Sequence, residues 1–337
     1  MSPPGRPKGE FLSAQREGSP VRPPGRPKGQ FLSAQREGRP LNTPAAPRLF
    51  LGLPAPAKLN LFLHVTGRRD DGYHLLQSVF VPISLADVLD FELRADGRIE
   101  RTGDVIGPAE GDLALRAAQA LQAAAGCPLG ATVNVEKHIP VGSGMGGGSS
   151  DAATTLIALN RLWGLDWPTS RLLPLALQLG ADVPFFLGPG AAWVEGIGET
   201  LTPLSVPACW MLVVHPQVQV STKEIFSDPG LTRCTKPSKI LAFSEALDGF
   251  PRALFGANDL EAVVRRRVPE VVAVLKSLAR FGPARMTGSG SAVFVPLADE
   301  QAAAAARAQV MSESPHWWSA IAKVLAEHPL GAWSPAR

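Results

Sequence analysis

The stretch PVGSGMGGGSSDAA at residues 140–153 has five glycines among the seven positions 142–148. Glycine has no Cβ and adopts positive φ values readily, so the stretch predicts a loop whose backbone amides a ligand can approach. Residues 131–136 before it alternate in polarity like a half-buried strand, and residues 152–163 after it carry apolar side chains at helical spacing. We therefore predict a strand-to-helix turn lined by backbone.

The ligand that such a turn favours is an anion, above all phosphate. The first amides of a helix have no partner within the helix, and with the helix dipole they attract negative charge. The alternative is a glycine-rich hinge in which Ser149 or Ser150 simply caps the helix. A cap needs one serine and no glycine triplet, so phosphate is the better prediction. The stretch lacks the Gly-Lys-Ser/Thr ending of a P-loop, and it does not follow the chain's first strand as the turn of a dinucleotide fold does.

The remaining pattern, Pro-x-x-x-Gly-x-Gly-Gly-Gly-Ser-Ser-Asp-Ala-Ala, resembles the ATP-binding motif of the GHMP kinases, a family that includes galactokinase, homoserine kinase and mevalonate kinase. Three other stretches carry the same resemblance: PAKLNLFLHVTGRRDDGYH at 56–74, LGADVPFFL at 179–187 and MTGSGSAVF at 286–294. The resemblance implies an α+β fold of two domains, with ATP and substrate in the cleft between them. It places ATP against Pro140, Gly142, Gly144, Gly146, Gly147, Gly148, Ser149 and Ser150.

The composition predicts a globular protein of the cytoplasm. A chain of 337 residues with 45% hydrophobic content can bury the cores of two modest domains. No apolar run reaches the roughly 18 residues of a membrane span, and the N-terminus has no apolar signal region. The cysteines Cys127, Cys209 and Cys234 fit neither a metal pattern nor a disulfide framework, and the histidines show no ligand spacing. We expect no metal site made by the protein alone.

Residues 1–50 have a different composition from the rest of the chain. PPGRPKGEFLSAQREG at 3–18 returns as PPGRPKGQFLSAQREG at 23–38, and the segment is rich in proline and basic residues. Such a segment cannot bury enough apolar surface to fold alone, so we predict a disordered tail and a fold that begins near Leu51. A basic arm for nucleic acid is the alternative, which the scarcity of aromatic residues disfavours.

Two further domains are predicted after the tail: an ATP-binding domain at 51–205 and a C-terminal GHMP domain at 206–337. Hydrophobic periodicity and turn residues predict the main elements within them. These are a hairpin of strands at 57–65 and 73–80, helices at 112–125 and 167–179, a strand at 211–215, a short helix at 221–226, a strand pair at 286–294 and a helix at 302–310.

The catalytic pair implied by the resemblance is Lys58 and Asp182. A lysine on a strand is usually solvated, and a carboxylate in a turn such as Asp182 often caps a helix. The resemblance implies instead that Asp182 is the catalytic aspartate and that Lys58 lies beside it. A carboxylate can accept the proton of a hydroxyl that attacks the γ-phosphorus of ATP, and a nearby cation keeps that carboxylate ionised.

The opening hairpin is most similar to the branch of the family that phosphorylates an alcohol linked to cytidine diphosphate. The resemblance implies phosphorylation of the 2-hydroxyl of a cytidine-diphosphate-linked methylerythritol, in the non-mevalonate route to isoprenoid precursors. It places Tyr73, His74 and Phe226 around the cytosine, and Asn60 and Thr222 near the methylerythritol and diphosphate. From its sequence position alone, Phe226 is better explained as a core residue of a short helix, and only the resemblance places it at the cytosine. Mg²⁺ is expected to accompany ATP, held largely by phosphates and water.

Two other functions stay open: another GHMP kinase, acting on homoserine, mevalonate or a sugar, and a catalytically silent nucleotide-binding protein. Intact Lys58 and Asp182 argue against the silent protein, and we expect small-molecule partners rather than nucleic acid or membrane. Two positions depart from the family pattern. Asp112 replaces an asparagine near the adenine, which removes an amide donor, and Met145 replaces a leucine, which changes only an apolar filler.

Overall fold

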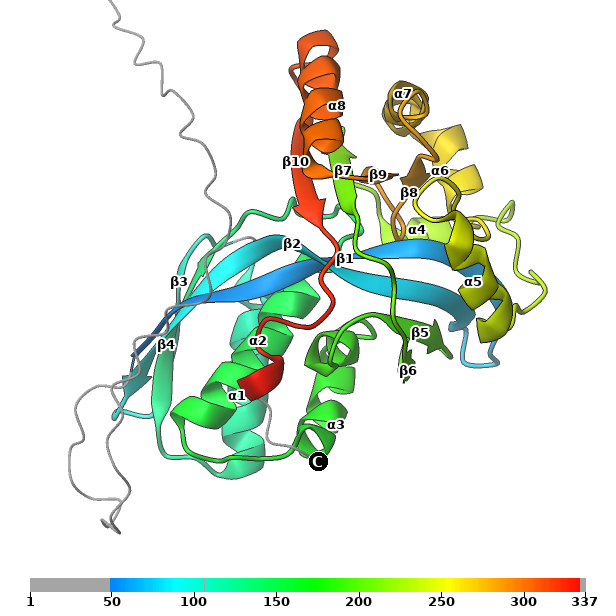
Figure 1. Cartoon of the computed structure of the whole chain (residues 1–337). Coiled ribbons are helices and arrows are strands. Elements are labelled where there is room, and N and C mark those ends of the chain that lie inside the picture. Colours follow the sequence, from blue (N-terminus) through cyan, green and yellow to red (C-terminus); the bar gives the residue numbers. More distant parts are fainter. Residues whose placement is uncertain (1–48, 106, 334–337) are drawn as a thin grey trace, which may run out of the picture. The chain divides into compact units, whose positions relative to one another are not determined.

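The structure is a computed structural model that describes residues 49–105 and 107–333 (Figure 1). All described residues belong to one compact unit. The predicted tail lies outside the described residues except for its last two positions, which form the start of the first strand. The predicted domain boundary between 205 and 206 stays a prediction.

A long antiparallel hairpin, β1 (Leu49–Arg68) and β2 (His74–Arg94), contains the two longest strands of the first sheet. The predicted strands at 57–65 and 73–80 are the middle of this hairpin. Its register shifts between Pro56 and Lys58 and again between Asn60 and Phe62. Bulges of this kind re-aim side chains. The sheet order is β3-β4-β2-β5-β6 with β1 on β2, where the other strands are β3 (Ile99–Gly103), β4 (Gly130–Glu136), β5 (Ala192–Glu195) and β6 (Thr200–Pro203).

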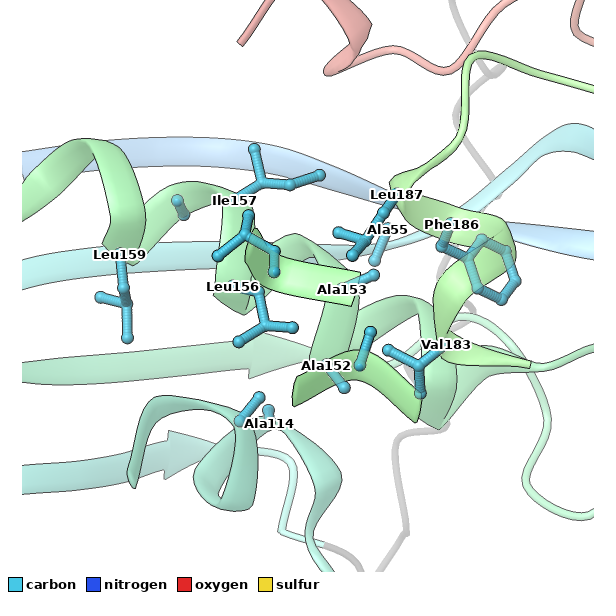
Figure 2. Close-up of a cluster of buried hydrophobic side chains, with 14 of the residues drawn as sticks. Ala55, Ala114, Ala152, Ala153, Leu156, Ile157, Leu159, Val183, Phe186 and Leu187 are labelled. Atoms are coloured by element: carbon cyan, nitrogen blue, oxygen red, sulfur yellow. The ribbon is translucent and has the colours of Figure 1, made fainter. Parts of the chain in front are cut away.

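Three helices pack together against this sheet: α1 (Leu113–Ala125), α2 (Gly147–Leu162) and α3 (Thr169–Leu179) (Figure 1). The central helix α2 is buried on almost all sides. Figure 2 shows its side chains, such as Leu156 and Ile157, gathered with Ala55 of β1 and Ala114 of α1 in one hydrophobic cluster. The core therefore holds α2, and with it the preceding glycine loop, in a fixed position.

The start of α2 differs from the sequence prediction. We expected a glycine loop up to about residue 151 and a helix from Ala152, but α2 begins at Gly147. The N-cap is Gly146 in the left-handed region, with φ of 72°. The prediction of a loop was therefore wrong for the last glycines, and both serines lie inside the helix rather than capping it. Glycine has low intrinsic helix propensity, and here the burial of the rest of the helix, from Ser150 onward, stabilises it despite these glycines.

The second sheet has the order β10-β7-β9-β8 and is antiparallel throughout. Its helices confirm the predicted short helix, as α4, and the alanine-rich one, as α8. The elements of this half are β7 (Trp210–His215), α4 (Thr222–Ser227), α5 (Ile240–Ala246), α6 (Glu261–Arg267), α7 (Pro269–Leu278), β8 (Arg285–Met286), β9 (Val293–Leu297), α8 (Glu300–Glu313) and β10 (Trp318–Lys323).

Backbone contacts join this half to the long hairpin, including bridges from Leu63 to Asn258 and from Ile83 to Val324. The hairpin therefore contacts both halves of the unit, and its side chains can interact with residues of either half. Among the residues that the structure describes, no helix is long and apolar enough to cross a membrane.

Candidate active site

A cavity of about 990 Å³ runs along the glycine loop and the middle of the hairpin. Its lining includes every residue that the sequence analysis assigned to the site except Ser150. That serine is fully buried in the first turns of α2, and its Oγ has no hydrogen-bond partner among the described residues. The cavity thus brings together β1, the loop, the segment after α3 and the start of α4.

Lys58 and Asp182 both line this cavity, and their charged groups lie side by side. Lys58 is only 3% exposed, and its Nζ lies 3.4 Å from Asp182 Oδ2 and 4.2 Å from the centroid of the Phe80 ring. The alternative of a solvated lysine is therefore wrong. Asp182 precedes the short 3-10 helix Val183–Leu187, but its side chain makes no cap hydrogen bond to any described residue. The capping alternative is wrong as well, and the carboxylate, one third exposed, is open to the cavity.

Asn60 connects Lys58 to the second half of the chain. Lys58 Nζ donates to Asn60 Oδ1 at 2.7 Å, and Asn60 Nδ2 donates to Ser78 Oγ at 3.1 Å. Thr287 Oγ1 also donates to Asn60 Oδ1, at 3.2 Å. Because burial of an unpaired ammonium group is costly, these partners keep the lysine head in one place.

Backbone hydrogen bonds hold the glycine loop to β1 on one side and to the 286–294 stretch on the other. The amide of Lys58 donates to Met145 O at 2.9 Å, and the amide of Ala292 donates to Ser143 O at 3.1 Å. A Cβ on Gly288 would lie 2.8 Å from Gly144 O, so the loop and the 286–294 stretch touch backbone to backbone. The 286–294 stretch therefore packs directly on the loop. Met145 is fully buried, as an apolar filler should be.

The side of Gly147 that a Cβ would occupy faces the protein interior. A Cβ there would lie 3.1 Å from Ile139 Cγ2 and 3.3 Å from Asp87 Oδ2. This glycine is needed because the start of α2 packs closely over the turn before the loop. The argument that glycine leaves room for the ligand therefore does not apply at this position.

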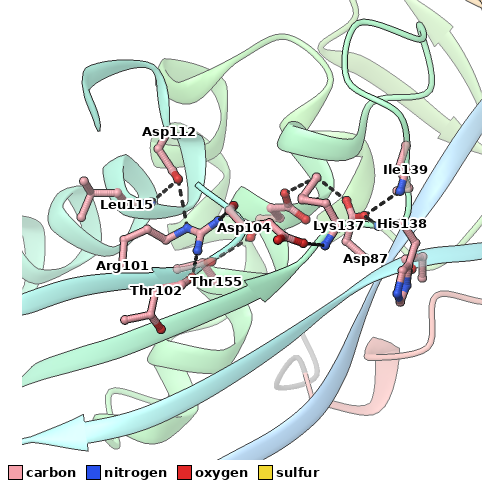
Figure 3. Close-up of polar contacts among 12 residues, drawn as sticks. Asp87, Arg101, Thr102, Asp104, Asp112, Leu115, Lys137, His138, Ile139 and Thr155 are labelled. Carbon is pink, nitrogen blue, oxygen red and sulfur yellow. Dashed lines mark hydrogen bonds and ion pairs between the residues drawn. The ribbon is translucent and has the colours of Figure 1, made fainter. Parts of the chain in front are cut away.

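A charge cluster that the sequence analysis missed lies beside the start of α2 (Figure 3). Lys137 Nζ contacts Asp87 and lies 2.7 Å from Asp151 Oδ2, while Asp87 Oδ1 accepts hydrogen bonds from the amides of His138 and Ile139. Burial raises the pKa of Asp151 to about 7, against the opposing effect of the Lys137 charge. Lys137 and Asp151 flank the glycine stretch in the sequence, which is a usable signal, but Asp87 is far away along the chain.

Asp112, which departs from the family pattern, forms an ion pair with Arg101. Asp112 Oδ1 accepts a hydrogen bond from the amide of Leu115 at 3.0 Å and so caps α1, while Arg101 Nε lies 3.0 Å from Asp112 Oδ2 (Figure 3). Both charged side chains line the cavity and are at most 10% exposed. The carboxylate that replaces an amide is therefore neutralised by an arginine. Local sequence did not indicate this pairing.

Part of the cavity lining is aromatic. The rings of His74 and Phe226 have centroids 5.0 Å apart at an interplanar angle of 33°, while Tyr73 is 61% exposed. Phe226 also packs against the hydrophobic cluster around α6 and α7, so it belongs to the core and to the cavity lining. Thr222 Oγ1 lies 2.7 Å from Ser289 Oγ, and this hydrogen bond joins α4 to the 286–294 stretch.

Two family descriptions match this chain: "GHMP kinases N terminal domain" over residues 112–190 and "GHMP kinases C terminal" over residues 242–316. Curated relatives named 4-diphosphocytidyl-2-C-methyl-D-erythritol kinase cover most of the chain. The relative from Ralstonia nicotianae is 53% identical over 291 residues, which is 86% of this chain and 99% of the relative. The relative from Methylibium petroleiphilum is 52% identical over 284 residues, 84% of this chain and 97% of the relative.

Solved structures agree with these relatives. A crystal structure of 4-(cytidine 5'-diphospho)-2C-methyl-D-erythritol kinase is 36% identical with a TM-score of 0.67, and the match covers 82% of this chain and 99% of that one. Mevalonate kinase from Methanococcus jannaschii is 14% identical with a TM-score of 0.59, covers 84% of this chain and all of that one, and supports the fold alone. The chain therefore belongs to the GHMP kinase family, among the 4-diphosphocytidyl-2-C-methyl-D-erythritol kinases.

Proposed function

We propose that this protein transfers the γ-phosphate of ATP to the 2-hydroxyl of 4-diphosphocytidyl-2-C-methyl-D-erythritol, a step of the non-mevalonate isoprenoid route. The observation that carries the proposal is that three groups line one cavity. The glycine loop adjoins the Lys58–Asp182 pair, and the rings of His74 and Phe226 line the same cavity. The relatives that share half of the sequence over nearly their whole length support the same substrate.

In this proposal the phosphates of ATP lie against the amides at the start of α2, where the helix dipole favours negative charge. Asp182 accepts the proton of the attacking hydroxyl, and Lys58 stabilises the charge that develops on the transferred phosphoryl group. General-base catalysis contributes roughly 10²–10⁴-fold, so positioning and charge stabilisation supply the remainder of the rate. The buried partners of Lys58 serve that positioning.

Mg²⁺ accompanies ATP in this proposal and neutralises part of its phosphate charge. Asp151 lines the cavity at the start of α2, and its Oδ1 is buried without a hydrogen-bond partner among the described residues. A carboxylate oxygen is a ligand that suits Mg²⁺. Asp151 is therefore the residue that would hold the ion, together with the phosphates and water. Asn60 and Thr222 line the cavity as the polar contacts proposed for the methylerythritol and diphosphate.

The proposal is tested by coupling ADP release to a spectroscopic readout while different acceptors are offered. We expect turnover with 4-diphosphocytidyl-2-C-methyl-D-erythritol, and none above background with homoserine, mevalonate or galactose. Phosphorylation of one of the latter three in preference to the cytidyl alcohol would contradict the proposal. Binding of ATP without turnover on any acceptor would identify a silent nucleotide-binding protein.

Phe226→Ala is expected to raise KM for the cytidyl substrate by roughly 5- to 150-fold, with little change in KM for ATP. The reason is that an aromatic ring stacked on a base contributes roughly 1–3 kcal/mol. Steady-state kinetics with each substrate varied in turn measures the effect. The matched control is Phe281→Ala, because Phe281 packs on the same hydrophobic cluster and lies outside the cavity lining. Equal effects on both substrates would make Phe226 a core residue only.

A further inference from the structure

Arg233 connects two aromatic residues that are far apart along the chain. Its Nε donates to His74 Nε2 at 3.1 Å, and its Nη2 donates to the backbone oxygens of Phe226 and Asp228 at 2.9 and 2.8 Å. Nη1 donates to Leu231 O at 3.2 Å. One guanidinium group therefore fixes both the ring of His74 and the end of α4 that carries Phe226.

We propose that Arg233 is a positioning residue that sets the tautomer of His74, so that the Nδ1–H of this histidine is offered to a hydrogen-bond acceptor on the pyrimidine of the substrate. The inference rests on the function proposed above and names the group that selects the base. Arg233 acts only through His74 and Phe226, and it is absent from the lining of the cavity.

The tautomer follows from the donor inventory of the two side chains. An arginine side chain has only donors, so His74 Nε2 must be the acceptor in their hydrogen bond. A neutral imidazole with an accepting Nε2 carries its proton on Nδ1. Burial lowers the pKa of His74, and the positive charges of Arg233 and Arg68 lower it further, so the ring stays neutral. Without this arginine, either nitrogen could carry the proton.

The nitrogen left for a ligand is therefore a donor. No residue in 49–105 or 107–333 bonds to His74 Nδ1, and the ring lines the cavity beside Phe226. Cytosine presents two acceptors on its pairing edge, N3 and O2, whereas uracil carries a hydrogen on N3. An N–H directed at N3 therefore favours cytosine and opposes uracil. Bases are commonly read on this edge while they stack on aromatic rings.

The alternative is that Arg233 is only a structural link for the turn at 226–231. The two roles predict different losses. A structural link that is removed displaces Phe226 and weakens every pyrimidine equally, because stacking does not distinguish one base from another. If Arg233 sets the tautomer, its removal also lets His74 adopt the form whose Nδ1 is an acceptor. Binding of cytosine then becomes weaker, and the unfavourable contact of Nδ1–H with the N3–H of uracil is lost.

The experiment compares the full-length protein with Arg233→Ala, Arg233→Lys and Arg68→Gln. The first readout is the ¹⁵N shifts of the His74 ring, which distinguish the two tautomers without substrate. The second is KM for 4-diphosphocytidyl-2-C-methyl-D-erythritol and for its uridine analogue. Arg68→Gln is the matched control, because it removes a positive charge that acts on His74 but leaves the bond to Nε2 in place.

We expect Nδ1–H in the unaltered protein and in Arg68→Gln, and a mixture of tautomers in Arg233→Ala. The preference for the cytidyl over the uridyl substrate should fall about 10-fold in Arg233→Ala, through KM and not kcat, as the loss of one hydrogen bond predicts. Lysine keeps a donor, so Arg233→Lys should recover part of the preference.

An Nε2–H tautomer in the unaltered protein would overturn the proposal, as would equal losses on both substrates in Arg233→Ala. If Arg233→Ala does not fold, the ring shifts of the unaltered protein and of Arg233→Lys decide the question. Failure of the protein to phosphorylate the cytidyl alcohol would refute the proposed function instead. The tautomer measurement does not depend on that result.

Discussion

Asp182→Asn is expected to lower kcat by roughly 10²–10⁴-fold while both substrates still bind. The amide has the shape of the carboxylate but cannot accept the proton of the attacking hydroxyl. It also leaves Lys58 Nζ, 3.4 Å away and almost fully buried, without an anionic partner. Steady-state kinetics measures the change. Asp71→Asn is a suitable control, since Asp71 lines the same cavity and pairs with Arg69 at the exposed turn of the hairpin.

Lys58→Ala should be impaired to a similar degree, and the double variant should be far less than multiplicatively worse. In the proposed mechanism the two groups act on one proton transfer, so removal of the first already forfeits most of what the second contributes. Fully multiplicative losses would show that the two residues act in separate steps. A near-normal kcat in Asp182→Asn would place the catalytic carboxylate elsewhere and refute the assignment.

Gly144→Ala is expected to reduce kcat/KM for both substrates by roughly 10²-fold. Gly144 has φ of 78°, and a Cβ there would overlap Thr287 O and lie 3.1 Å from Gly290 N. These contacts are with backbone atoms, which cannot rotate away. The loop and the 286–294 stretch must therefore move apart, and a displacement of about 1 Å near a reacting centre can cost 10²-fold.

Gly164→Ala is the control for backbone strain. Gly164 follows the end of α2 with φ of 67°, and no atom lies within 4 Å of the position that its Cβ would take. The left-handed conformation should cost this variant about 1–2 kcal/mol of stability and leave its kinetics unchanged. Thermal unfolding and kinetics of both variants separate the two effects. Equal kinetics in both would show that the contact with Thr287 has no functional role.

The sequence was sufficient to predict the glycine loop, the hairpin and most helices, because each has a local pattern. The Lys58–Asp182 pair depended on the family resemblance, since nothing local connects a strand lysine to a distant turn. Arg233 and Asp87 were not predicted for the same reason: each is an isolated charged residue whose partner lies far along the chain. The early start of α2 was missed because tertiary burial outweighs the poor helix propensity of glycine.

Two register shifts, or bulges, of the β1–β2 hairpin flank Lys58 and Asn60, so the positions of these two side chains depend on the strand alignment. Lys58 and Asn60 lie between the bulges, on a strand that is buried along most of its length. Because neighbouring strand residues face opposite sides, one residue inserted or deleted between 56 and 62 would exchange these polar side chains for the apolar neighbours Leu59 and Leu61. A change in chain length at the turn of the hairpin, beyond Arg68, would instead leave Lys58 in its place.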